Sequence, residues 1–253
     1  MNKKKVAFWV PMTIAALVVI FSACSKKEAQ VVSKEPQQAS SSSAIPINDP
    51  IESLPLGDPN YPIDSYKEIL SNNDLMFTYY ALSKEQPDYD KITSNYALQY
   101  WATNDQFKRR DLVESQKPEI DKEIAARKDA RYVKLKVNAT WKVQKYDFDK
   151  KAFPQVAVTN QSQFGWDAKE WVNRNKIAIS YFATFTNGDE FNLLKVEDER
   201  VARLIEEKKH EEMSLIVYGF VQGVDPQEPL LKVQVLDVTL INKDGVELLS
   251  KRL

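Results

Sequence analysis

The chain has 253 residues, a formal net charge of −1, one histidine and one cysteine. Such a balance gives no electrostatic reason to expect a nucleic-acid partner, because domains that bind nucleic acid usually carry a basic surface. One histidine and one cysteine are too few for the usual zinc sites. We therefore expect no metal and no other cofactor.

The first 23 residues have the pattern of an export signal. Lysines occupy positions 3–5, and an uncharged stretch rich in Val, Ile, Ala and Leu follows over residues 6–21. A membrane-spanning helix needs about 20 apolar residues, and this shorter stretch is also interrupted by Pro11. A basic start followed by a short apolar stretch is typical of a segment that is removed after export.

The end of this segment, Phe21-Ser22-Ala23-Cys24, resembles the lipobox of bacterial lipoproteins. That motif places a bulky apolar residue and two small residues before an invariant cysteine, although leucine is commoner where Phe21 stands. The resemblance implies cleavage before Cys24, a diacylglyceryl thioether on its sulfur and acylation of the new amino group. The alternatives are an ordinary secretory signal or an uncleaved anchor that carries a cysteine by chance.

The resemblance also predicts where the protein resides. Two or more acyl chains make membrane anchoring stable. We therefore expect a membrane as partner, to which lipid on Cys24 anchors the protein. In enteric-type bacteria an aspartate after the lipidated cysteine marks retention in the inner membrane, and here that position is Ser25. We therefore expect a cell-envelope protein on the periplasmic face of the outer membrane.

Residues 24–60 have the composition of a disordered tether. Ser40 to Ser43 form a serine run, five prolines lie between positions 36 and 59, and apolar residues occur singly. Such a segment buries too little apolar surface to fold. We expect one domain over residues 61–253, held near the membrane by this tether.

The first part of that domain, residues 61–130, has helical periodicity. We predict a helix over residues 74–82 with Asp74 as its N-cap, and a second over residues 88–112 that starts at Pro87-Asp88. Pro118 is predicted to open a third helix.

From residue 131 the period of the apolar positions changes to two, which indicates strands. The alternation over residues 133–143 predicts a long strand with Trp141 on its buried face and Lys142 on its exposed face. A second strand over residues 177–185 is followed by Asn187-Gly188, a strong hairpin signal. The return strand is predicted over residues 190–196.

The remaining elements complete an α+β fold. We predict a helix over residues 197–212, central strands over 215–224 and 230–241 because both faces are apolar, and a hairpin at Asp244-Gly245 to an edge strand over 246–249. The predicted fold is a set of N-terminal helices followed by an antiparallel sheet with one inserted helix. The order of strands and helix is that of an OB-fold, so we expect a curled, OB-like sheet.

One charged stretch, Tyr146 to Pro154, resembles a segment that recurs in an uncharacterised family of bacterial envelope proteins. The likeness extends loosely over residues 61–253. It implies an envelope location and brings no known activity with it.

The candidate ligand-binding residues are Trp166, Asp167 and Trp171, which lie in a predicted loop between strands. Loops on a rigid scaffold often carry function, and aromatic faces beside a carboxylate suit sugar rings. The alternative is that these aromatic side chains plug one end of the sheet.

No catalytic motif accompanies these features. The chain has no Gly-x-Ser-x-Gly, His-Glu-x-x-His, Walker or Gly-x-Gly-x-x-Gly sequence. We therefore expect a non-enzymatic binding or structural role with an envelope protein or glycan as partner. The alternative is a hydrolase acting on glycan or peptidoglycan through two carboxylates, which need only a suitable separation.

Overall fold

A computed structural model describes residues 54–165 and 179–253. Within these residues the helices and strands are η1 (Ile63–Ser65), β1 (Lys67–Glu68), α1 (Asn72–Leu82), α2 (Tyr89–Tyr96), α3 (Gln99–Ala102), α4 (Gln106–Ala125), β2 (Tyr132–Asn138), β3 (Ala152–Pro154), β4 (Gln163–Gly165), β5 (Phe182–Phe185), η3 (Gly188–Phe191), β6 (Leu193–Lys195), α5 (Glu199–Lys208), β7 (Met213–Asp225), β8 (Leu230–Asn242) and β9 (Glu247–Arg252). Over these two ranges, none of the helices has the length and apolar character needed to cross a bilayer.

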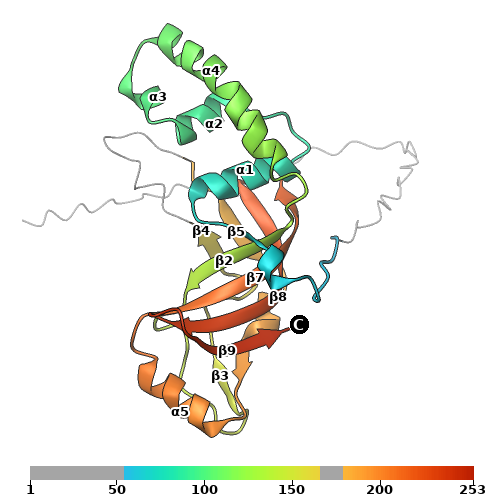
Figure 1. The fold of residues 1–253 in the computed structure, drawn as a ribbon, viewed down its shortest axis with the longest axis vertical. Helices are drawn as coiled ribbons and strands as arrows, with labels where there is room; N and C mark the ends of the chain where they lie inside the picture. The colour runs from blue at the N-terminus through green and yellow to red at the C-terminus, as the bar shows by residue number, and fades with distance from the viewer. Residues whose placement is uncertain (1–53, 166–178) are drawn as a thin grey trace, which may run out of the picture. The chain divides into compact units, whose positions relative to one another are not determined.

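The predicted α+β class is confirmed, with a seven-stranded sheet whose path is β1-β2-β7-β8-β5-β4 and with β9 paired to β8 (Figure 1). The long strands β7 and β8 pair antiparallel at its centre, as their apolar sequences predict. The pairs β1–β2 and β5–β8 are parallel, so the sheet is mixed and the prediction of an antiparallel sheet is wrong in this respect. The sheet is not closed into a barrel, and an OB-like arrangement is not confirmed.

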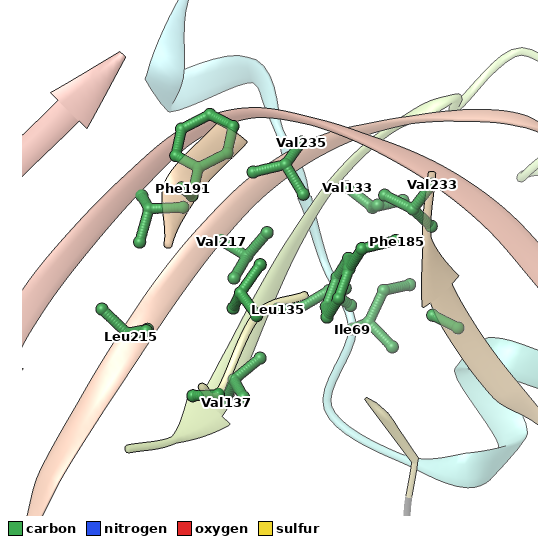
Figure 2. Packing of buried hydrophobic residues seen from close by; sticks show 14 of the residues in the cluster. Ile69, Val133, Leu135, Val137, Phe185, Phe191, Leu215, Val217, Val233 and Val235 are labelled. Atoms are coloured by element: carbon green, nitrogen blue, oxygen red, sulfur yellow. The ribbon is translucent and has the colours of Figure 1, made fainter. Parts of the chain in front are cut away.

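One face of this sheet forms the main core. The alternation predicted for β2 is confirmed at Val133, Leu135 and Val137, which are all buried. These side chains pack with residues of β5, β7 and β8, such as Phe185 and Val217, in a continuous apolar cluster (Figure 2). Burial of aliphatic and aromatic side chains from four strands is the main stabilising contribution of this layer.

Strand β2 ends earlier than its sequence pattern predicts. The side-chain oxygen of Asn138 accepts the N–H of Thr140 at 2.9 Å, a local turn that competes with strand pairing. Trp141 then takes a φ of 64° and is 69% exposed. The prediction that Trp141 lies on the buried face is therefore wrong, whereas Lys142 is exposed as predicted.

The helical layer agrees with the predicted class but differs in its boundaries. The N-cap of α1 is Ser71, whose hydroxyl accepts the N–H of Asp74 at 3.2 Å, while Asp74 accepts the N–H of Leu70 at 3.1 Å. Asp74 is thus the second half of a reciprocal cap and not the N-cap itself. Asp88 caps α2 as predicted.

The predicted helix over residues 88–112 is divided among α2, α3 and the start of α4. The side chain of Asp105 caps α4 by accepting the N–H groups of Phe107 and Lys108. Pro118 lies inside the 20-residue helix α4, so the prediction that it opens a helix is wrong. Proline fits the first turn of a helix best, because inside a helix it removes a backbone hydrogen bond.

Two asparagine side chains join the helical layer to the chain that enters β5. The Asn95 amide accepts the Ile179 N–H at 2.8 Å and donates to the Ile179 carbonyl at 3.0 Å. Asn72 accepts the Tyr181 N–H at 2.7 Å and donates to the same Ile179 carbonyl at 3.1 Å. These amides replace the partners that a neighbouring strand would supply, which lets helices cover this end of the sheet.

The opposite face of the sheet is covered by the first described residues, which the sequence placed in the tether. The Gly57 N–H donates to the Gln234 side chain at 2.9 Å, and the Pro55 carbonyl accepts from Gln222 at 2.9 Å. A Cβ at Gly57 would lie 2.5 Å from Phe220, so the close approach requires glycine here. Pro55 and Gly57, which precede residue 61, therefore contact the sheet of the domain.

The Asn187-Gly188 dipeptide does not form the predicted hairpin. Gly188 begins η3, and the following strand β6 pairs with β3 in a separate two-stranded sheet. The Asn187 amide bonds instead to Val235, accepting its N–H at 2.7 Å and donating to its carbonyl at 3.0 Å. A Cβ at Gly188 would lie 2.6 Å from the Thr159 backbone, so this glycine serves a close approach and not a positive φ.

The second predicted hairpin is confirmed. Gly245 has a φ of 77° in the turn between β8 and β9, a conformation that glycine adopts at no steric cost. The helix predicted over residues 197–212 is confirmed in α5, which starts after Asp198 and ends at Lys208.

Candidate functional site

The residues predicted to bind a ligand cannot be placed. Trp166, Asp167 and Trp171 lie outside the described residues, as does Cys24. Phe164, on the near side of the same loop, lies in β4 opposite Ala183 and packs against the core. The choice between a binding face and a plug therefore stays open for the three loop residues.

A surface groove lies elsewhere, between α5 and the turn that follows β2. It has a volume of about 520 Å³ and we call it the α5 groove. Its lining residues are Lys145, Tyr146, Phe148, Glu199, Ala202, Arg203, Glu206 and Glu207. Ligand pockets commonly have volumes of about 300–1,000 Å³, so a small molecule or part of a polymer would fit.

Helix α5 supplies one wall of the groove. Asp198 caps this helix by accepting the Arg200 N–H, and its pKa is lowered by hydrogen bonds from the Arg200 side chain and N–H. Five residues from Glu199 to Glu207 line the groove at intervals of three, one, three and one, which places them on one helix face. Ile205 points away from that face and is fully buried.

The turn before β3 supplies the opposite wall. The Tyr146 hydroxyl donates to the Val196 carbonyl at 3.1 Å, and its ring lies 5.0 Å from the ring of Phe153. Phe148 meets the Tyr146 ring edge-on, with centroids 5.0 Å apart and an interplanar angle of 87°. Tyr146 is thus anchored, whereas Phe148 is 79% exposed.

Two of the three carboxylates that line the groove are held by neighbours. Glu206 pairs with Lys209 and accepts the Tyr146 N–H at 3.2 Å, while Glu199 pairs with Arg203 at 2.6 Å. Burial raises the pKa of Glu206, but the hydrogen bonds from Lys209 and from the Tyr146 N–H outweigh it, so the net pKa is lowered. Glu206 is consequently an ionised acceptor that connects the two walls.

Trp141 and His210 lie near the C-terminal end of α5. Their ring centroids are 4.9 Å apart at an angle of 44°. The backbone on each side of Trp141 is fixed, because the Lys142 N–H donates to the Ala139 carbonyl and the Ala139 N–H donates to the Met213 carbonyl. These bonds hold Trp141 in the left-handed region, which bulky residues rarely adopt.

A second cavity, of about 580 Å³, lies near the end of α1 and the start of β2. Two of its polar side chains, Arg131 and Gln222, are engaged within the domain. Arg131 donates to the carbonyls of Val221 and Gln222 at 3.3 Å, and Gln222 donates to Pro55. This arrangement joins the first described residues to the sheet and offers less for a ligand than the α5 groove.

Across residues 54–165 and 179–253, no group of three or more His, Cys, Asp or Glu side chains is arranged to hold a metal ion. Glu199 and Glu206 of the α5 groove are engaged with cations and a backbone N–H instead.

Comparison with known proteins gives no relative from which a site could be transferred. No protein-family model matches the chain, and searches of curated proteins and of solved structures found no match. The geometry of the groove is therefore the basis for assigning a role to the domain.

The sequence analysis did not identify this groove, because its walls come from two segments about 50 residues apart. A signal was present in one of them. Tyr146 and Phe148 lie in a short stretch with many charged residues, beyond the strand that the alternation predicts over residues 133–143. Exposed aromatic side chains in such a stretch indicate an interaction surface.

Proposed function

We propose that this chain is an exported lipoprotein, anchored by lipid on Cys24 at the periplasmic face of the outer membrane, with a non-enzymatic binding role. The observation that carries the proposal is the sequence Phe21-Ser22-Ala23-Cys24 at the end of a basic and apolar leader. Cys24 is the only cysteine, so the one thiol of the chain stands where lipidation requires it.

The α5 groove supports the binding role. It combines an anchored ring, Tyr146, with the exposed ring of Phe148 and with polar side chains on α5. Binding sites commonly combine apolar lining with a few polar groups that fix orientation. The partner would be an envelope protein or an envelope glycan within reach of the tether.

A hydrolase that uses two carboxylates is the alternative, and the groove favours it less. A glycosidase needs one carboxyl group whose pKa is raised so that it donates a proton. Glu206 has the opposite tendency, since Lys209 and the Tyr146 N–H lower its pKa. The Glu199 carboxylate is paired with Arg203.

Metabolic labelling with palmitate tests the anchor. We expect label on the wild-type chain and on the matched control Ser25→Ala, and no label on Cys24→Ala, which lacks the acceptor sulfur. Retention of label by Cys24→Ala would contradict the lipoprotein assignment.

Membrane fractionation in an enteric-type host tests the location separately. We expect the wild-type chain in the outer membrane and the variant Ser25→Asp in the inner membrane, because aspartate at this position is the retention signal of such hosts. A wild-type chain found wholly in the inner membrane would contradict the predicted location while leaving lipidation intact.

A further inference from the structure

We propose that the α5 groove, together with the adjacent Trp141 ring, binds carbohydrate, with the pyranose rings of an uncharged glycan strand as its ligand. The inference rests on the binding role proposed above and specifies the class of partner. Five features of the described residues support it: the strain at Trp141, the ring geometry, the charge balance, the state of the backbone and the extent of the surface.

Trp141 has an unfavourable backbone conformation that its own burial does not offset. A left-handed φ of 64° is costly for a residue with a Cβ, and strained positions of this kind cluster at functional sites. The side chain is 69% exposed, and the ring that contacts it belongs to His210. The strain places an indole ring at the surface, where it is available to a ligand.

The exposed rings suit the shape of a sugar. A pyranose presents C–H groups on one face and hydroxyl groups around its edge, so it packs flat on an aromatic ring while its edge forms hydrogen bonds. Phe148 offers an exposed ring, fixed at its edge by the anchored ring of Tyr146. Polar side chains of α5, such as Arg203 and Glu207, stand beside it as hydrogen-bonding groups.

The charges around the groove are balanced, which favours an uncharged ligand. Its lining contains two cations, Lys145 and Arg203, and three glutamates. Lys209 pairs with Glu206, so three cations match three acids around the site. A strongly charged ligand would have to compete with the Lys209–Glu206 and Arg203–Glu199 pairs, whereas a neutral one can donate to and accept from these side chains.

The backbone beside the groove argues against an extended peptide. Peptides often bind by adding a strand to free main-chain groups. Here the Gln144 N–H donates to the Pro154 carbonyl and the Asp147 N–H donates to the Ala152 carbonyl, both at 2.8 Å. The Tyr146 N–H is taken by α5, so side chains and not main-chain groups are offered to the ligand.

The extent of the surface fits a polymer better than a single sugar. The groove-facing residues of α5 run from Glu199 to Glu207, which corresponds to roughly 12 Å along a helix. His210 follows three residues after Glu207, in the turn beyond α5, and its ring contacts that of Trp141. Phe148 lines the groove and Trp141 lies against His210, beyond the C-terminal end of α5, so exposed rings are offered at two places.

Calorimetry on the full lipidated chain in detergent micelles tests the proposal. The probe is the uncharged β-1,4-linked tetrasaccharide of N-acetylglucosamine, and a free cell-wall stem peptide is titrated in parallel. We expect the tetrasaccharide to bind, and we expect Trp141→Ala and Phe148→Ala each to weaken its binding by about three- to tenfold. Trp141→Phe, which keeps a ring, should restore most of the affinity.

The matched control is Phe107→Ala, because Phe107 is 70% exposed but lies at the start of α4, away from the groove. It should bind as the wild type does, and thermal melting of each variant checks that the fold is kept. Absence of tetrasaccharide binding, binding unchanged in both groove variants, or binding of the stem peptide alone would overturn the proposal. Palmitate labelling separates the outcomes, since a labelled chain that binds no glycan leaves the anchor intact and removes only this inference.

Discussion

Two groups of aromatic side chains in the described residues differ in how far they are buried. Where the helices meet the sheet, Tyr79, Tyr80 and Tyr181 are buried against one another. At the α5 groove Phe148 is 79% exposed, and Trp141, which lies against His210 beyond the end of α5, is 69% exposed. Both regions are built from well-formed local structure, so the difference is not one of disorder against order.

At the helix–sheet junction the aromatic residues stabilise the fold. The Tyr79 hydroxyl donates to the Asp225 carbonyl at 3.1 Å, and the Tyr181 and Tyr80 hydroxyls lie 3.4 Å apart. Burial raises the pKa of Tyr181, so its hydroxyl stays neutral. Phe148 and Trp141 bury little of their surface, which fits the binding role that we propose for them.

The largest effect is expected from Tyr181→Ala. Tyr181 is 1% exposed at the centre of the junction, and loss of its ring leaves a cavity. We expect the free energy of unfolding to fall by about 3–5 kcal/mol, measured by urea denaturation. Tyr181→Phe, which keeps the ring, should cost about 1 kcal/mol or less; an equally large loss in both variants would contradict the packing argument.

A smaller loss is expected from Asn95→Ala. Asn95 is 5% exposed, and its amide satisfies both backbone groups of Ile179. Its removal leaves those groups without this partner and should lower the free energy of unfolding by about 1–3 kcal/mol. The control Gln106→Ala changes an exposed amide on α4 and should stay within about 0.5 kcal/mol of wild type. Equal effects from the two changes would show that the asparagine link is not needed.

The strain at Trp141 predicts a difference between two variants at one position. Glycine tolerates a φ of 64°, whereas alanine keeps the Cβ that makes this conformation costly. Trp141→Gly should therefore be about 1 kcal/mol more stable than Trp141→Ala in urea denaturation. If alanine proved the more stable, the left-handed conformation would not be the one that the protein adopts.

The smallest effect concerns pH. Glu206 has a pKa below its ordinary value of 4.5, because Lys209 and the Tyr146 N–H together outweigh the opposing effect of burial. A lowered pKa in the folded state contributes stability above the unfolded pKa and loses it as pH falls through the folded pKa. The stability advantage of wild type over Glu206→Gln should therefore shrink as the pH is lowered below 4.5. An advantage that is constant across this pH range would contradict the assignment of Glu206 as an ionised link.

Much of the fold follows from local patterns in the sequence. The two-sided apolar strands β7 and β8, the alternation in β2 and the Asp244-Gly245 hairpin are all confirmed. Each of these depends on a few neighbouring residues whose chemistry is decisive, such as Gly245 at a positive φ.

The failures have tertiary causes. The Asn187 side chain is hydrogen-bonded to the Val235 backbone, and Gly188 packs closely against the Thr159 backbone. The dipeptide therefore does not form a hairpin turn. The parallel pairing of β5 with β8 could not be predicted from the sequence of either strand, because it depends on which strands become neighbours in the folded sheet.

The candidate site was harder to predict than the fold. Phe148 and Glu206 line the same groove although they lie far apart in the sequence. The periodicity of a sequence does not show which distant segments pack together. A charged helix face such as that of α5 has the same sequence whether it faces solvent or a ligand. Trp141 was assigned to the wrong face because the turn at Asn138 ends β2 before it.

The most direct test of the account is a paired measurement on the double variant Trp141→Ala/Phe148→Ala of the full lipidated chain. Urea denaturation should give a free energy of unfolding within about 1 kcal/mol of wild type, because both rings are exposed. Retention on the immobilised N-acetylglucosamine tetrasaccharide should be lost. A variant that loses several kcal/mol of stability yet keeps its retention on the glycan would contradict the account, since the rings would then serve the fold and not a ligand.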